Sequence, residues 1–193
     1  MKTDIILSGV GGQGILSIAA VIGEAPLKEG LYMKQSEVHG MSQRGGDVQS
    51  NLRLSSHPVA SDLIPRGGAD LILSLEPMES LRYLPYLKQG GWVVTHSEPY
   101  VNIPNYPPIE AVYATLDRLP HKLVLDVERI AKEVGSTRAA NIVLLGAAAP
   151  FLGIDYTQLE EGVRQIFRRK GEAVVLLNIL ALRAGFEQHI QTR

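Results

Sequence analysis

The chain alternates between short apolar runs and apolar residues at helical spacing, a pattern typical of α/β proteins. Residues 4–8 are mainly apolar and end at a glycine cluster, which predicts a buried strand. Beyond the glycines, apolar residues at helical spacing predict a helix that runs to about Lys28 and stops at Gly30. They are Ile15, Leu16, Ile18, Ala19 and Ile22. A strand, a glycine turn and a helix form the first half of a βαβ unit.

Further strands are predicted by short apolar runs and by one alternating segment. Residues 33–46 show no clear period, and residues 36–47 are predicted to be a glycine-rich loop. Val48, Leu52 and Leu54 then alternate with polar residues, which indicates a strand with one wet face, typical of antiparallel pairing. The remaining predicted strands are 69–75, 92–95, 111–115 and 122–125.

Helices are predicted over the rest of the chain, and they fill its C-terminal third. One begins at Pro77, runs through Leu84 and is closed by Gly90 and Gly91. Thr157 and Glu160 have the spacing of a capping box at the start of another. The other predicted helices are 127–134, 139–152 and 173–186.

The helices 139–152 and 173–186 have almost no polar face. A helix that is apolar all round must be buried on every side. Two such helices in a chain of 193 residues indicate an exposed apolar patch and hence a partner. A sheet densely covered by helices remains the alternative.

Gly9, Gly11 and Gly14 match the spacing G-x-G-x-x-G between the first strand and the first helix. Glycine permits a tight turn and lets an anion approach the N–H groups at a helix N-terminus. Three interpretations stay open: a nicotinamide or flavin site, a turn that contacts a phosphate-bearing group or a partner chain, and simple strand–helix packing. The acid that would bind a ribose about 20 residues further on has no buried strand before it.

A second polar cluster lies in the predicted glycine-rich loop. Its candidate ligand or subunit contacts are Glu37, His39, Gln43, Arg44, Gly45 and Gly46. Arg44 could clamp a carboxylate or phosphate with two hydrogen bonds, and Glu37 with His39 could serve in acid–base chemistry. An ordinary solvated loop is the alternative.

We therefore expect one domain over residues 1–193, with a three-layer α/β/α Rossmann-like fold. Its sheet should be mostly parallel with at least one antiparallel strand, and its C-terminal third helical. Composition agrees with a globular chain, since 45% of residues are hydrophobic and 20% charged.

Charge and cysteine content narrow the function. A net charge of −1 gives no bulk field for nucleic acid or an anionic membrane, and no apolar run is long enough to span a bilayer. The absence of cysteine excludes iron–sulfur ligation, thiolate zinc sites and a cysteine nucleophile on this chain. It fits a reducing compartment, so we expect a cytoplasmic location without a leader segment. The scattered histidines show no metal-ligand pattern, and we assign no metal site and no catalytic residue.

Four ordered motifs resemble the gamma-type subunit of 2-oxoacid:ferredoxin oxidoreductases. The first is the segment 5–16, including Gly11, Gly12, Gln13 and Gly14, and the second is 37–46. The third is 69–73 with Glu76 and Pro77, and the fourth is 138–146. The residues of the second motif are most similar to those of the beta subunit of indolepyruvate:ferredoxin oxidoreductase. The resemblance covers nearly the whole chain.

The resemblance implies a reaction that this chain does not perform alone. A 2-oxoacid such as indolepyruvate is decarboxylated on thiamine diphosphate, electrons pass through iron–sulfur clusters to ferredoxin, and the acyl group goes to coenzyme A. The thiamine and the clusters are expected on a separate large catalytic subunit. Both glycine-rich segments would then face that subunit, near coenzyme A or the substrate.

Two rival functions remain open at this stage. One is a free-standing NAD(P)- or flavin-dependent reductase, and the other is a purely structural subunit whose glycine-rich segments touch no ligand. Self-association of the purified chain through its apolar helices is a further open alternative.

Overall fold

A six-stranded sheet forms the centre of the protein in the computed structural model, which describes residues 1–27, 30–39, 45–101 and 103–191. The spatial order of the strands is β2-β3-β1-β4-β5-β6. Their bounds are β1 Lys2–Val10, β2 Tyr32–His39, β3 Asp47–Ser55, β4 Ala69–Ser74, β5 Leu87–His96 and β6 Lys122–Leu125.

The sheet is mixed, as the alternating segment predicted. β1, β4, β5 and β6 pair in parallel, whereas β3 runs antiparallel to both β1 and β2. β2 therefore points the same way as β1. The carboxyl ends of five strands consequently lie at one edge of the sheet, which we call the carboxyl edge.

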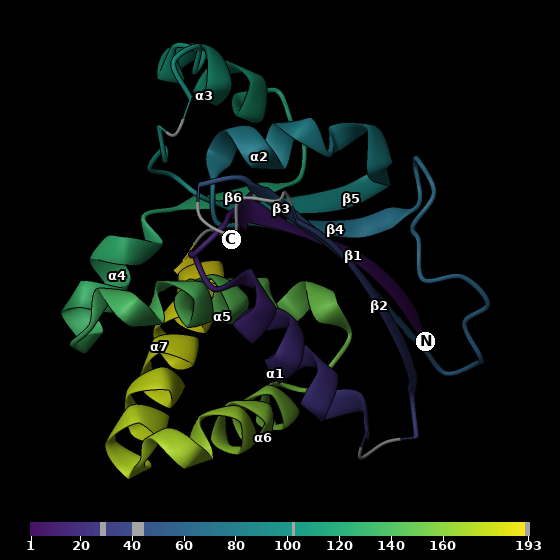
Figure 1. The fold of residues 1–193 in the computed structure, drawn as a ribbon, viewed down its shortest axis with the longest axis vertical. Coiled ribbons are helices and arrows are strands. Elements are labelled where there is room, and N and C mark those ends of the chain that lie inside the picture. The colour runs from purple at the N-terminus through teal and green to yellow at the C-terminus, as the bar shows by residue number, and fades with distance from the viewer. Residues whose placement is uncertain (28–29, 40–44, 102, 192–193) are drawn as a thin grey trace.

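Helices cover both faces of the sheet, so the expected three-layer α/β fold is confirmed (Figure 1). α2 and α3 lie on one face, and the remaining helices lie on the other, with α6 and α7 farthest from the sheet. The helix bounds are α1 Ile15–Leu27, α2 Pro77–Arg82, α3 Ile109–Asp117, α4 Val127–Val134, α5 Ala140–Leu152, α6 Tyr156–Phe167 and α7 Glu172–Gln191.

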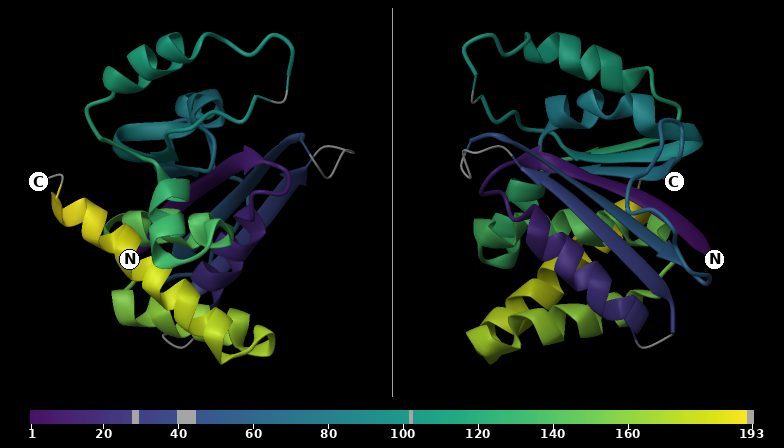
Figure 2. Two further views of the ribbon diagram at one scale, coloured as in Figure 1. Left: turned by 90° about the vertical axis from the view of Figure 1, so that its left-hand side faces the viewer. Right: turned by 45° about the vertical axis from the view of Figure 1, so that its right-hand side comes forward.

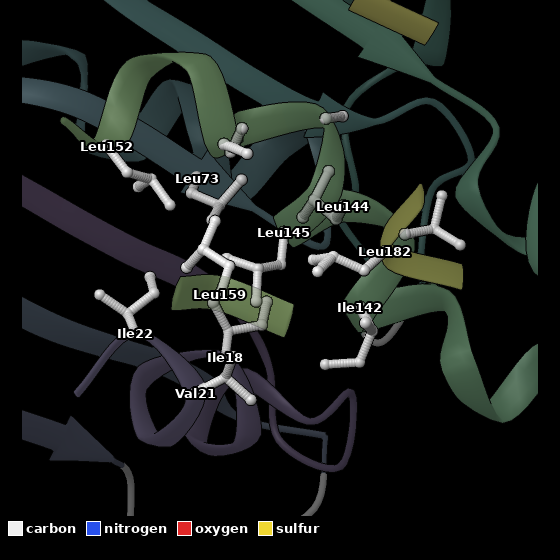
Figure 3. Close-up of a cluster of buried hydrophobic side chains, with 14 of the residues drawn as sticks. Ile18, Val21, Ile22, Leu73, Ile142, Leu144, Leu145, Leu152, Leu159 and Leu182 are labelled. Atoms are coloured by element: carbon white, nitrogen blue, oxygen red, sulfur yellow. The ribbon is translucent and has the colours of Figure 1, made fainter. Parts of the chain in front are cut away.

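The larger core lies between the sheet and α5. Successive side chains of a strand point to opposite faces, so Ile5 and Leu7 enter this core while Ile6 enters the smaller core under α2 and α3. Figure 3 shows α5 at the centre of the larger core. Its leucines meet Ile18 and Ile22 of α1 and Leu159 of α6. Burial of α5 on all sides explains why it has no polar face.

The prediction of a loop over residues 36–47 is wrong at both ends, because Tyr32–His39 form strand β2 and Asp47 begins β3. β2 is an edge strand, and most of its described side chains are exposed or half-buried on both faces. No hydrophobic alternation is required of such a strand, which is why the sequence shows no period there.

Two other local predictions are also corrected. Residues 111–115 are helical within α3, where Val112 and Leu116 are four residues apart and both buried. The helix that begins at Pro77 ends at Arg82, and Gly90 and Gly91 lie inside β5.

The predicted capping box does not form. α6 begins at Tyr156, so Thr157 already lies within the helix, and Asp155 occupies the N-cap position without a side-chain hydrogen bond. The apolar helix α7 leaves its outer face exposed, so the expectation of an exposed apolar patch holds for this helix.

Buried tyrosines make the fold sensitive to alkaline pH. Burial raises the pKa of Tyr83 and of Tyr156 to about 12, and burial followed by the Glu76 carboxylate raises the pKa of Tyr106. Unfolded tyrosines ionise near pH 10, so above that pH the unfolded state binds fewer protons than the folded state. These tyrosines leave the free energy of unfolding unchanged below about pH 10, and we expect it to fall between about pH 10 and 12.

Urea unfolding from pH 8 to 11.5 measures this decline, and Tyr156→Phe should make it shallower. A stability that stays flat up to pH 11.5 would contradict the expectation.

Candidate functional site

The glycine turn after β1 is fixed by the side chain of Gln13. Its Oε1 accepts a hydrogen bond from the Val10 N–H at 2.7 Å, and its Nε2 donates to the carbonyl of Leu75 at 3.0 Å. One side chain thereby closes the turn and ties it to the end of β4. Gln13 thus has a positioning role that the spacing of the glycines did not reveal.

Two of the turn glycines are required by close packing. A Cβ at Gly9 would lie 2.8 Å from Gln13 Oε1, and one at Gly14 would lie 2.7 Å from Asn141 Nδ2. Asn141 of α5 donates to the Gly14 carbonyl at 3.1 Å. Gly12 has a φ of +103° and open space around it, so its backbone faces outward from the turn.

The structure brings the second glycine-rich segment against the first. The Gly11 N–H donates to the Gly46 carbonyl at 2.8 Å, and the Gly45 N–H donates to the Gly11 carbonyl at 3.3 Å. Glu37 of β2 lines the same region. His39 ends β2, opposite Val48, but its side chain is outside the described part of the structure, as are Gln43 and Arg44 altogether.

A pocket of about 350 Å³ lies on the β2–β3 side of the turn. Its lining combines backbone of Gly11, Gly12 and Gly14 with the side chains of Leu16, Glu37 and Val48. It is mainly apolar, with a single carboxylate among these side chains.

A larger crevice of about 590 Å³ lies on the other side of the turn, over the carboxyl ends of β4 and β5. The helix after β1 packs on one face of the sheet and the helix after β4 packs on the other. Open α/β sheets bind ligands at this kind of switch in helix direction. The side chain of Gln13 lies at that switch.

The crevice contains polar and charged groups that the sequence did not single out as a site. Arg138 and Lys170 supply two cations, Glu128 an anion, and His96 an imidazole that is only 3% exposed. His96 Nδ1 lies 3.1 Å from the Leu125 carbonyl oxygen and 3.3 Å from the Val127 nitrogen. α1, α4 and α5 begin around the crevice, so their N-terminal N–H groups add to a preference for anions. In the sequence, Arg138 and Asn141 stand out only as part of the fourth motif, 138–146.

Large apolar side chains are exposed around the same edge. Leu16 is 51% exposed at the start of α1, beside the turn, and Val38 is 57% exposed near the carboxyl end of β2. Tyr100 is 48% exposed and Val101 68%, and they follow the carboxyl end of β5. Apolar side chains gathered at one edge are typical of a protein–protein contact.

The described residues contain neither a metal-binding cluster of histidine and carboxylate side chains nor a helix long and apolar enough to cross a bilayer.

The strand order differs from that of a dinucleotide-binding fold. In a dinucleotide fold the strand after the first helix pairs with β1, but here β3 lies between β1 and β2.

Fold and site together define a doubly wound α/β protein with a glycine turn at the carboxyl edge of its sheet. The chain belongs to the pyruvate ferredoxin/flavodoxin oxidoreductase family, whose model matches residues 4–188. The resemblance read from the four motifs is therefore confirmed.

Relatives of known description support this membership over the full length. The chain is 34% identical to indolepyruvate oxidoreductase subunit IorB of Archaeoglobus fulgidus, covering 100% of this chain and 98% of the relative. It is 39% identical to the subunit of the same name from Thermococcus kodakarensis, covering 86% and 84%.

Among solved structures, a keto/oxoacid ferredoxin oxidoreductase gamma subunit from Geobacter sulfurreducens PCA matches with a TM-score of 0.70. It is 28% identical, and the match covers 98% of this chain and 99% of the other.

Proposed function

We propose that this chain is the thiamine-free and cluster-free subunit of a 2-oxoacid:ferredoxin oxidoreductase that acts on indolepyruvate or a similar aryl pyruvate. The observation that supports this proposal most strongly is the full-length similarity to subunits of indolepyruvate oxidoreductases, at 34% and 39% identity. The holoenzyme would decarboxylate the oxoacid to an acyl-CoA in the cytoplasm and pass the electrons to ferredoxin. The isolated chain would be inactive.

The chemistry of iron–sulfur ligands supports the assignment of the cofactors to another subunit. Iron–sulfur clusters are held mainly by cysteine thiolates, and this chain has no cysteine. The clusters therefore do not fit these residues, and we assign them with thiamine diphosphate to the large partner subunit. Coenzyme A would be a co-substrate that reaches this chain only at its carboxyl edge.

We place the contact with the catalytic subunit at the carboxyl edge. Both pockets, the glycine turn, the described ends of the second glycine-rich segment and the exposed Leu16 and Val38 lie there. A rim of exposed apolar side chains around two pockets suits a surface that closes over a ligand shared between two subunits.

Charged side chains introduced into this rim should weaken binding to the catalytic subunit. Leu16→Lys with Val38→Lys would bury two ammonium groups in the interface, and we expect at least a tenfold loss of affinity for the catalytic subunit, about 1.4 kcal/mol or more. Pull-down of the co-expressed subunits measures it. Leu63→Lys is the matched control, because Leu63 is 55% exposed in the loop between β3 and β4, at the opposite edge. Equal binding by the rim and control variants would remove the carboxyl edge as the contact.

Arg44 is the proposed anion contact in the second glycine-rich segment. Arg44→Ala should raise the apparent KM for coenzyme A or the oxoacid about tenfold, since a bidentate guanidinium contact to an anion is lost, while assembly stays intact. Steady-state kinetics of the holoenzyme measure this, with the exposed Arg66→Ala as control. Unchanged kinetics would favour the purely structural subunit over a ligand-contacting one.

A further inference from the structure

The outer face of α7 carries apolar side chains that no described residue covers. Leu176 is 57% exposed and Leu180 45%, and Ala173 is exposed beside them. Figure 2 shows α7 as a long helix across the outside of the molecule, in the layer farthest from the sheet. Arg183 and Glu187 continue the same line toward the C-terminal end, with side chains 69% and 53% exposed.

These exposed positions have the spacing of a coiled-coil seam. The intervals between Ala173, Leu176, Leu180, Arg183 and Glu187 alternate between three and four residues. This is the a and d pattern by which two helices pack along their length. We call these five residues the α7 seam.

The inner face of α7 is already occupied, so rotation of the helix cannot bury the seam. Gly185 packs so closely on α5 that a Cβ there would lie 1.9 Å from the Val143 carbonyl oxygen. Asn178, Ile179 and Leu182 are buried on that side. Both faces of the helix are apolar, and among the described residues only the inner face has a packing partner.

We propose that the α7 seam binds the same seam of a second copy of this chain, with the two helices antiparallel. The charged side chains of α7 favour antiparallel over parallel pairing of the two helices. In a parallel pair Glu172, Arg183 and Glu187 would each face their own copy, which places like charges together. In an antiparallel pair centred at Asn178, Leu176 of one copy packs on Leu180 of the other.

The same register brings opposite charges together. Glu172 lies about 9 Å before the centre and Arg183 about 7.5 Å after it, at a rise of about 1.5 Å per residue. In the two-fold pair, Glu172 of each copy therefore lies level with Arg183 of the other. Glu187 extends past the first residue of the opposing α7, toward the cationic segment Arg168–Lys170 that precedes that helix in the chain. The seam is thus complementary to itself, which an interface between two copies requires.

The seam shares no residue with the proposed contact at the carboxyl edge. Pairing through α7 would therefore join two copies while each remains free to bind a catalytic subunit. The small apolar area predicts a modest affinity, with a dissociation constant in the micromolar range.

Sedimentation equilibrium of the full chain from about 5 to 200 µM tests this proposal at concentrations that bracket a micromolar constant. We expect a monomer–dimer equilibrium for the wild type and a monomer for Leu176→Glu with Leu180→Glu. Both leucines are exposed, so this variant should keep the wild-type circular dichroism and Tm. Leu63→Glu is the control and should dimerise as the wild type does.

Charge exchange tests the direction. Glu172→Arg and Arg183→Glu should each weaken the dimer about tenfold, because each replaces two attractive pairs by two repulsive ones. Combining them should restore the wild-type constant to within about threefold. A wild-type monomer at 200 µM, a dimer that survives the leucine variant, or a double exchange that restores nothing would each overturn the proposal.

Discussion

Replacing Gly185 with alanine should destabilise the protein by about 3 kcal/mol or more, because the new methyl group has no space between α7 and α5. Its Cβ would lie 1.9 Å from the carbonyl oxygen of Val143 and 3.0 Å from the backbone nitrogen of Ala147. These are backbone atoms of a buried helix, so neither can move aside without separating the two helices. Gly146→Ala should behave alike, since its Cβ would lie 1.9 Å from the Leu182 carbonyl oxygen.

Thermal unfolding followed by circular dichroism measures the effect, and a loss of about 3 kcal/mol corresponds to a Tm lowered by about 6–12 °C in a chain of this size. Gly23→Ala is the matched control in α1. Its Cβ would meet only the flexible end of the Met33 side chain, at 3.1 Å. That substitution should be neutral or stabilising, because alanine favours a helix over glycine by up to about 1 kcal/mol. Equal Tm values for Gly185→Ala and Gly23→Ala would contradict the close α5–α7 contact.

Arg53→Met should cost about 3–5 kcal/mol, because it leaves the Asp4 carboxylate buried without its guanidinium. Arg53 donates to both oxygens of Asp4, at 2.8 and 3.0 Å, and the Asp4 side chain is only 1% exposed. Arg53 also donates to the carbonyls of Ser61 and Leu63, so it holds the loop between β3 and β4. Urea unfolding measures the loss.

Two further variants separate burial of charge from loss of a contact. Asp4→Leu combined with Arg53→Met removes both buried charges and should recover most of the stability. Arg129→Met breaks an ion pair to Glu133 of 2.6 Å whose side chains are 59% and 62% exposed, and it should cost no more than about 1 kcal/mol. If Arg53→Met and Arg129→Met cost the same, the Asp4–Arg53 pair is not buried as described.

The sequence predicts well those elements whose burial on one face or both produces a recognisable pattern of apolar residues. β1, β6 and α4 are buried on one side or both, and their apolar residues show it. β2 leaves no pattern, because an edge strand buries little on either face. α7 has an apolar pattern all round, but the sequence could not show that one face lies against α5 and the other is open.

Of the candidate site, too, one part could be predicted from the sequence and another could not. The G-x-G-x-x-G spacing correctly indicates the turn at the end of β1, because glycine is required there by close contacts. The crevice could not be predicted, since His96, Arg138 and Lys170 come from segments that only the strand order brings together. The pairing of Gly11 with Gly45 and Gly46 depends on β3 running back along β1, which a predicted loop did not imply.

The central claim is that this chain works as one subunit of an oxoacid oxidoreductase, and anaerobic affinity purification of the tagged full-length chain from native extract tests it most directly. The account predicts a large co-purifying partner that contains thiamine and iron, with reduction of a viologen dye that depends on both indolepyruvate and coenzyme A. A colourless chain that purifies without a partner, or that retains a nicotinamide or flavin nucleotide, would contradict it.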